Sequence, residues 1–353
     1  MTGSPLRLTV RLPHSRCFAS RDAIIRVAEA AEELGYWGVT VEDHFLLPRQ
    51  PCATADPVDG RTVFEALATL AFVAARTERL KLITGVLVVP MRHPIMLAKE
   101  TATLDALSGG RLVLGIGVGA LRRRTTAENV NLVSNARIAT REFDALAIHG
   151  DRGPLTDEYL AAVRELWQAD PASFDGRHVS FSGLDLYPRP VQARIPIWVG
   201  GRSDKALRRA ARNDGWFPSQ CSAEFLASGR RSIERYARED GTAPPSEFGP
   251  SNAACVLPSE SAARDAMERL YGYYFTTREA LWSQTITGSP ETVARRLAEY
   301  RAAGATFADL RFLPISIESI LEQMRLVAER VVPALAEGVE PSAAVSADRR
   351  TPG

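Results

Sequence analysis

The clearest pattern of hydrophobic and polar positions lies in residues 79–119. A near-continuous apolar run over residues 80–89 is typical of a strand buried on both faces, as in a parallel sheet. A helix is predicted to begin at Pro94, because proline is tolerated in a first helical turn and residues up to 107 repeat at helical spacing. A second buried strand follows over residues 112–116. The segment is therefore predicted to form a βαβ unit.

Strand and helix patterns alternate along the rest of the chain. Strands are expected at residues 6–12, 37–42, 80–89, 112–116, 195–199, 215–218, 252–257 and 307–312, and helices at 22–34, 63–77, 94–107, 156–168, 203–212, 223–238, 262–271, from 289 onward, and 317–331. Eight strands alternating with helices predict an α/β protein with a single (β/α)8 TIM barrel rather than an open doubly wound sheet. The barrel is assigned to residues 1–337, with an insertion at 120–141 and a hairpin-like excursion at 174–192. Residues 338–353 are predicted to be a disordered tail.

Composition and charge narrow the classes of function. The chain is 45% hydrophobic and 24% charged, as in ordinary globular proteins, and its net charge is +1. This balance gives no electrostatic reason to expect nucleic acid or a membrane as partner. We see no signal peptide or membrane-spanning run and expect a cytoplasmic protein. The four cysteines lie far apart without a CxxC pair. They indicate buried free thiols rather than a disulfide framework, and no metal site is predicted.

In a barrel the chemistry belongs at the carboxyl ends of the strands, where one acid/base pair stands out. Asp43 and His44 follow the second predicted strand. A carboxylate beside an imidazole can hold one tautomer and let the ring titrate near neutrality. The alternative is a pair that only caps a loop or makes a structural hydrogen bond. Spacing alone does not separate the two.

Glycines mark three further strand ends. Thr84-Gly85-Val86 lies within the third strand, where a glycine indicates either a bulge near a ligand or space for helix packing. Gly115, Gly117, Val118 and Gly119 end the fourth strand and leave it without bulky side chains. Gly200-Gly201-Arg202 ends the fifth strand just before a helix. Its free N–H groups and the helix dipole suit a phosphate, although a glycine pair alone is also found in ordinary turns.

Five stretches together resemble the luciferase-like flavin and deazaflavin oxidoreductases, specifically the bacterial branch that uses coenzyme F420. They are the segment at 79–119, LGYWGVTVEDHFLLP (34–48), SFDGRHVSFSGLDLYPRPVQARIPIWVGGRS (173–203), NDGWFP (213–218) and TGSPETVARRLAEYRAAGATFADL (287–310), and they occur in the family's order. The resemblance spans roughly residues 6–330.

The resemblance implies a function and roles for these residues. It places the Asp43-His44 dipeptide in the cofactor site, with His44 against the deazaflavin ring, and a non-proline cis peptide between Gly85 and Val86 behind that ring. It assigns the cofactor phosphate to Gly200-Gly201, with the 115–119 loop on the other side. The implied reaction is hydride transfer between F420 and a small organic substrate, with His44 as proton carrier. A homodimer is expected on the same basis.

Two departures from the family pattern keep other functions open. The chain has 22 residues, 120–141, between Gly119 and Glu142, where relatives pass quickly into a helix that begins with a Glu-Phe pair. This stretch is interpreted as a lid, an anion-binding arm or a solvated insertion. Ala120 replaces a glutamate that several relatives use for acid/base chemistry, which leaves His44 as the candidate. The alternatives are an FMN-dependent monooxygenase that uses FMNH2 from a partner reductase and O2, and a catalytically silent barrel.

Overall fold

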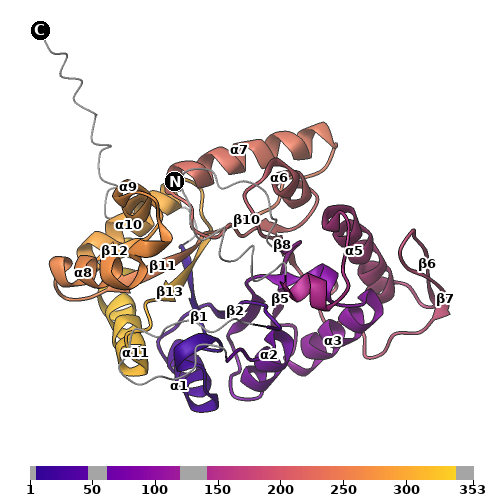
Figure 1. Cartoon of the computed structure of the whole chain (residues 1–353), viewed down its shortest axis with the longest axis horizontal. Coiled ribbons are helices and arrows are strands. Elements are labelled where there is room, and N and C mark those ends of the chain that lie inside the picture. The colour runs from indigo at the N-terminus through magenta and orange to yellow at the C-terminus, as the bar shows by residue number, and fades with distance from the viewer. Residues whose placement is uncertain (1–4, 47–61, 120–140, 339–353) are drawn as a thin grey trace, which may run out of the picture.

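A curled parallel sheet surrounded by helices forms the body of the molecule in a computed structural model that describes residues 5–46, 62–119 and 141–338 (Figure 1). Its strands are β1 (Arg7–Arg11), β2 (Gly38–Val41), β3 (Lys81–Thr84), β4 (Leu87–Val88), β5 (Leu112–Gly117), β8 (Ile197–Val199), β9 (Gly215–Trp216), β10 (Glu247–Phe248), β11 (Ser251–Val256), β12 (Ile286–Gly288) and β13 (Phe307–Phe312). Neighbouring strands run in the order β10-β9-β8-β5-β3-β2-β1-β13-β11-β12, and β4 pairs with β5. From β1 to β10 the order follows the sequence, as the alternating pattern predicts.

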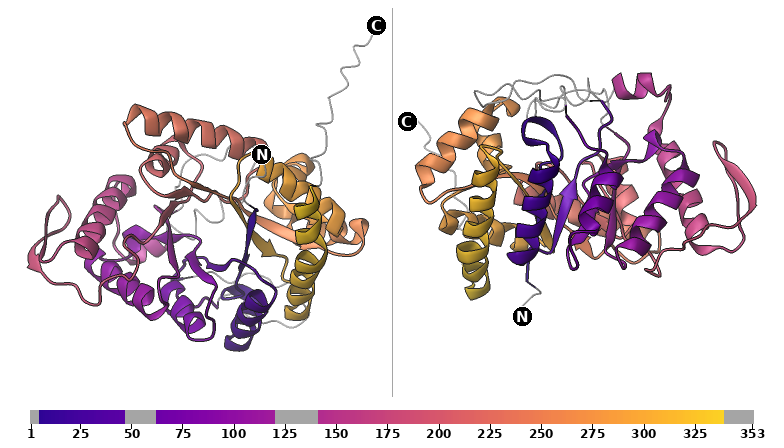
Figure 2. Two further views of the ribbon diagram at one scale, coloured as in Figure 1. Left: turned by 180° about the vertical axis from the view of Figure 1, so that it is seen from behind. Right: turned by 90° about the horizontal axis from the view of Figure 1, so that it is seen from below.

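Helices cover the outer face of this sheet in both views of Figure 2. They are α1 (Arg21–Glu33), α2 (Ala66–Ala74), α3 (Pro94–Leu107), α5 (Arg152–Gln168), α6 (Asp204–Ala211), α7 (Ala223–Glu239), α8 (Glu260–Tyr271), α9 (Arg278–Ser283), α10 (Pro290–Ala302), α11 (Ile317–Leu326) and α12 (Val332–Glu337), with single-turn helices at Arg16–Phe18, Val89–Met91 and Gly272–Tyr274 and a π-helix at Val327–Val331. Serine N-caps explain where several begin, because their side chains accept a hydrogen bond from an amide of the first turn. Ser20, Ser203 and Ser289 do so for α1, α6 and α10.

The two faces of the sheet bury different side chains, because successive residues of a strand point to opposite sides. Leu8, Val10 and Leu310 belong to the large core between sheet and helices. The intervening residues point into the curl, where the Thr9 hydroxyl donates to Asp309 at 3.0 Å. The interior of the curl therefore carries polar side chains.

An aromatic layer fills the interior on the amino-terminal side of Asp309. The Trp198 and Phe307 rings stack with centroids 4.3 Å apart, and Phe217 meets Phe307 edge-on at 5.3 Å. Ile83 and Val113 complete this cluster. Because the layer is closely packed, space for a ligand lies toward the carboxyl ends of the strands.

The predicted excursion at 174–192 contains an antiparallel hairpin, β6 (Ala172–Asp175) and β7 (Ser180–Leu184), which projects beyond α5 (Figures 1 and 2). Its return to the body is held by Asp105, a buried residue of α3. One carboxylate oxygen of Asp105 accepts from the backbone amides of Val191 at 2.8 Å and Gln192 at 3.0 Å. A buried acid of α3 therefore helps to fix the point at which this segment rejoins the body.

Several expected elements differ in detail. The apolar run at 80–89 divides into β3 and β4, interrupted at Gly85-Val86. The strands β10 and β12 and the helix α9 were not expected, and the last helical region extends through a π-helix to Glu337. Hydrophobic runs of two or three residues are too short to show a period, so such strands escape pattern analysis. The expected tail, apart from Gly338, and residues 120–140 lie outside the described residues.

The expectation of four free thiols is wrong. Cys17 is disulfide-bonded, whereas Cys221 and Cys255 are free and buried; Cys52 lies outside the described residues. Separation in sequence does not show which loops meet in the fold, so cysteine spacing could not exclude a pair. No helix in the described parts of the chain is long and apolar enough to cross a membrane.

Candidate active site

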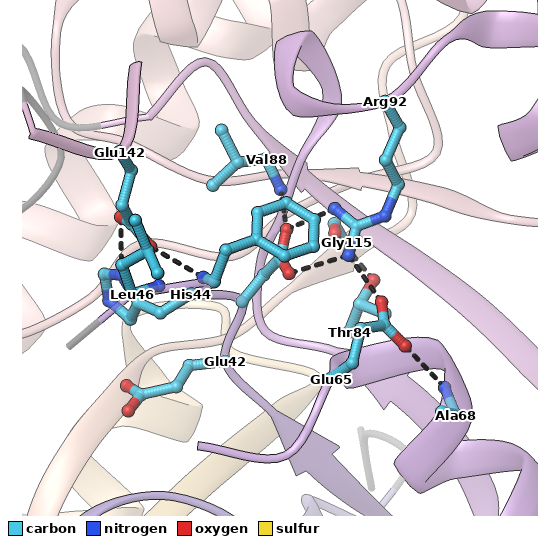
Figure 3. Close-up of polar contacts among 12 residues, drawn as sticks. Glu42, His44, Leu46, Glu65, Ala68, Thr84, Val88, Arg92, Gly115 and Glu142 are labelled. Carbon is cyan, nitrogen blue, oxygen red and sulfur yellow. Dashed lines mark hydrogen bonds and ion pairs between the residues drawn. The ribbon is translucent and has the colours of Figure 1, made fainter. Parts of the chain in front are cut away.

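His44 is held by a glutamate that is distant in sequence. Its Nδ1 lies 3.0 Å from Oε2 of Glu142, and the other carboxylate oxygen accepts from the backbone amides of Phe45 at 2.6 Å and Leu46 at 2.9 Å (Figure 3). The Glu142 side chain is 1% exposed and that of His44 is 18% exposed. One buried carboxylate thus fixes both the imidazole and the loop that carries it. Nε2 of His44 has no hydrogen-bond partner within the described residues.

The surroundings of His44 favour its protonated form. Burial alone would lower the pKa of the imidazole. The hydrogen bond to Glu142 and the negative charges of Glu42 and Glu142 outweigh burial and raise the pKa above its ordinary value. The protonated form of His44 is therefore stabilised, which suits a group that donates a proton through Nε2.

Asp43 does not pair with His44, so the predicted acid/base dipeptide is wrong as a contact. Its carboxylate accepts from Arg92 through both oxygens, at 2.6 and 2.8 Å, and from the Val88 amide at 2.8 Å. Arg92 also binds Glu65 at 2.5 Å. Neighbouring residues of an extended segment point in opposite directions, which separates Asp43 from His44. Asp43 is a buried structural anion that ties the end of β2 to β4 and the loop after it.

The peptide bond between Gly85 and Val86 is cis, as the resemblance implied. A Cβ at Gly85 would lie 3.0 Å from the Phe217 ring. The carbonyl oxygen of Gly85 accepts from Nη2 of Arg11 at 2.8 Å. The Thr84 hydroxyl donates to the Gly115 carbonyl at 2.7 Å. The strand interruption is thus fastened to β1 and β5.

The glycines at the strand ends are explained largely by packing around Val86. A Cβ at Gly117 or Gly200 would lie 2.8 or 2.9 Å from the Val86 methyl groups. A Cβ at Gly115 would lie 1.9 Å from the Thr84 carbonyl oxygen. Gly119 has a φ of +78°, and a Cβ there would meet Phe143, while Val118 beside it is half-buried. The structure therefore brings the third, fourth and fifth strand ends together, as expected, but protein atoms occupy much of the space that the missing side chains leave.

The Gly200-Gly201-Arg202 turn retains features that suit an anion. Gly201 adopts a φ of +96°, which favours glycine, and its carbonyl accepts from Nε1 of Trp216 at 2.9 Å. Within the described chain, no hydrogen bond occupies the amides of residues 201–203 at the start of α6. Arg202 stacks on Phe225 and donates to the Gln220 carbonyl at 2.9 Å. A cation and free amides therefore meet at one helix start, as a phosphate requires.

A charged cluster inside the curl escaped sequence analysis. Arg11 donates to Glu42 at 2.9 Å and lies 3.8 Å from Asp309. Asp309 also accepts from the hydroxyls of Thr40 at 2.8 Å and Ser251 at 2.6 Å. The sequence does carry a signal for this cluster, because the first and eighth predicted strands have charged residues at alternate positions.

Glu42 is an anion in this cluster. Burial opposes its charge, but Arg11 and His44 hold the pKa of its carboxyl well below the ordinary range. Its second oxygen accepts from the Ser15 hydroxyl at 2.7 Å. Glu42 therefore supplies a fixed negative charge near His44.

Within the described residues, no group of three or more potential metal-ligating side chains is found.

The chain is thus an α/β protein whose curled parallel sheet carries an oriented histidine and a glycine turn at its strand ends. A family model described as luciferase-like monooxygenase matches residues 6–306, and the chain belongs to this family.

Similar curated proteins and solved structures agree with this assignment. An uncharacterized protein of Mycobacterium tuberculosis is 29% identical over 248 residues, which cover 68% of this chain and 80% of that protein. An F420-dependent glucose-6-phosphate dehydrogenase of Kineococcus radiotolerans is 30% identical over 247 residues, which cover 68% and 66%. A monooxygenase from Streptomyces bottropensis superposes with a TM-score of 0.73 at 23% identity, covering 93% of this chain and 99% of that one. The F420-dependent tetrahydromethanopterin reductase of Methanopyrus kandleri gives 0.71 at 18%, covering 94% and 100%. At these identities the structures support the fold alone.

Proposed function

We propose that the protein is an oxidoreductase that transfers hydride between coenzyme F420 and a small organic substrate. The observation that carries the proposal is the His44–Glu142 pair. A histidine at a strand end is held by a buried carboxylate, is stabilised in its charged form, and has one ring nitrogen without a hydrogen-bond partner among the residues that the structure describes. Two similar curated proteins are named F420-dependent glucose-6-phosphate dehydrogenases, which supports coenzyme F420 as the cofactor.

The residues present fit such a cofactor. The free amides at residues 201–203, with Arg202 beside them, would hold its phosphate, and the Gly85-Val86 interruption would back its ring. Asp204 in the first turn of α6 is occupied by Tyr236 and Arg208, so its negative charge is partly compensated at this end. When bound, the deazaflavin supplies the carbon that gives or receives hydride.

The role of the protein side chains is to hold and move a proton. His44 would give a proton to the substrate oxygen, or take one, through Nε2. Glu142 keeps the ring in one orientation and stabilises the charge that His44 carries. Because Glu142 is buried and makes three hydrogen bonds, it acts as a positioning residue rather than as a proton donor.

We further propose that the sheet closes as a single (β/α)8 barrel. Backbone hydrogen bonds extend from the β9 side to β11 and β13: Gly249 donates to Trp216 at 3.1 Å, Ser251 to Pro218 at 2.9 Å, and Asp309 to Pro250 at 2.9 Å. In this reading β10 and β11 are two parts of the seventh strand.

The homodimer expected by resemblance is tested by light scattering of the purified protein.

Cofactor titration tests the proposed function. Purified protein is titrated separately with F420 and with FMN, and binding is followed by the change in cofactor fluorescence. We expect micromolar binding of F420. Micromolar binding of FMN without F420 binding would refute the proposal and favour the monooxygenase, which oxygen consumption with reduced FMN would then reveal. Binding of neither cofactor would favour a catalytically silent barrel.

A further inference from the structure

Arg311 is an inward-facing cation at the carboxyl edge of the sheet. On β13, Phe307 lies in the aromatic layer and Asp309 binds Thr9, so the alternation places Arg311 on the same interior side, nearer the strand end. The register pairs Thr9 with Asp309 and Val10 with Leu310, which puts Arg11 beside Arg311. The two guanidinium groups therefore belong to neighbouring strands at the candidate active site.

The carboxylates in this region form ion pairs with Arg11. Glu42 and Asp309 both lie within ion-pair distance of Arg11. Among the described residues, no carboxylate forms an ion pair with Arg311, and its Nε and Nη2 atoms are buried without a hydrogen-bond partner. Nε of Arg11 is likewise buried without a hydrogen-bond partner among the described residues. Leaving buried guanidinium N–H groups without an acceptor costs free energy, so this place favours a ligand that accepts hydrogen bonds, such as an anion.

Tyr271 provides a further donor near these arginines. Nε2 of Gln220 donates to the Tyr271 hydroxyl oxygen at 2.6 Å, which leaves the hydroxyl proton free to donate elsewhere. Burial raises the pKa of this hydroxyl, although the charges of Arg311 and Arg11 oppose the rise. Tyr271 is thus a neutral O–H donor beside two cations, and Gln220 connects it to Arg202 of the proposed phosphate turn.

We propose that Arg311, assisted by Tyr271 and Arg11, binds an anionic group of the substrate, a carboxylate or a phosphate. The inference rests on the proposed function, because it makes the hydride partner a small organic anion. Glu42 and Asp309 remain the ion-pair partners of Arg11, so an anion on Arg311 would accept from N–H groups that have no hydrogen-bond partner among the described residues. Planar guanidinium donors also match the oxygen pair of a carboxylate or phosphate. A neutral alcohol or ketone would leave the Arg311 N–H groups unpaired.

Anion binding is tested without the cofactor, by calorimetric titration of the protein with benzoate, phenyl phosphate and neutral benzamide. We expect benzoate or phenyl phosphate to bind about 10- to 100-fold more tightly than benzamide, as expected for hydrogen bonds to a charged group. The anion that binds more tightly shows whether the site prefers a carboxylate or a phosphate. Equal affinity for benzamide and both anions would overturn the proposal.

Substitutions assign the site. R311Q should remove the preference for the anion, whereas R311K, which keeps the charge, should retain part of it. R231Q on the exposed face of α7 is the matched control and should bind as the unchanged protein does. Anion preference that persists in R311Q would overturn the assignment. The comparison of benzoate with benzamide on the unchanged chain still decides the case if R311Q does not fold. Failure of F420 to bind would count against the proposed function and leave this measurement intact.

Discussion

Asp43→Asn should destabilise the fold, because the structure makes Asp43 an ion-pair partner of Arg92. The side chains of Asp43 and Arg92 are 0% and 7% exposed, and two hydrogen bonds of 2.6 and 2.8 Å join them. Two unit charges about 4 Å apart attract by about 4 kcal/mol at an effective dielectric constant of about 20. Removing one partner of a buried pair costs about 3–5 kcal/mol, since the other charge stays buried. Glu65 still contacts Arg92, so we expect about 3 kcal/mol of lost unfolding free energy.

Urea unfolding followed by tryptophan fluorescence measures this loss, and refolding from urea checks reversibility. The matched control is Glu65→Gln, which removes the other carboxylate on Arg92. The Glu65 side chain is 36% exposed, so this change should cost about 1 kcal/mol or less. If Asp43→Asn unfolds at the urea concentration of the unchanged protein, the Asp43–Arg92 pair is not structural. Loss of F420 affinity with unchanged stability would return Asp43 to the cofactor site.

Four further substitutions test the candidate active site. His44→Ala should lower kcat by about 10²–10⁴-fold with the circular dichroism spectrum unchanged; full turnover at saturating F420 would show another proton route. Glu142→Gln should shift the alkaline limb of the kcat/KM profile to lower pH, because the proton-donating form of His44 is lost as pH rises through a pKa that Glu142 raises; an unmoved limb would exclude His44. Gly201→Val should raise the Kd of F420 more than it lowers kcat, since φ there is +96°; the reverse order would contradict a phosphate role. Gly115→Ala should lower the Tm, because its Cβ would lie 1.9 Å from a backbone carbonyl oxygen of β3; an unchanged Tm would mean that β3 and β5 separate freely.

Much of the fold follows from local patterns. The helix beginning at Pro94 and the strand at Leu112–Gly117 occur where the apolar spacing and the proline predict them. The interruption at Gly85 was found through a glycine within an apolar run. The two-residue strand β10 and the three-residue strand β12 were not found, because their hydrogen bonds come from neighbouring strands rather than from their own sequence.

The site was less accessible to sequence analysis for a physical reason. His44 and Glu142 are 98 positions apart, and no local pattern states that Glu142 will meet the end of β2. The Asp43-His44 dipeptide suggested a pair, but adjacent extended residues diverge. Gly117 was assigned to cofactor access, whereas the Val86 side chain occupies that space. Sequence thus located the strand ends but not the partners of their side chains.

The carboxylate of Asp309 has a consequence for how the chain folds during synthesis. It accepts hydrogen bonds from Thr9, 300 positions earlier, and from Thr40, 269 positions earlier. At about 5–20 residues per second, the first strand waits about 15–60 s on the ribosome before this carboxylate is made. Until then the interior hydroxyls of β1 and β2 lack their acceptor, and Arg11 has one carboxylate instead of two. The polar interior is therefore completed by the last strand, and we expect a chain that stops before β13 to be less stable than one that includes it.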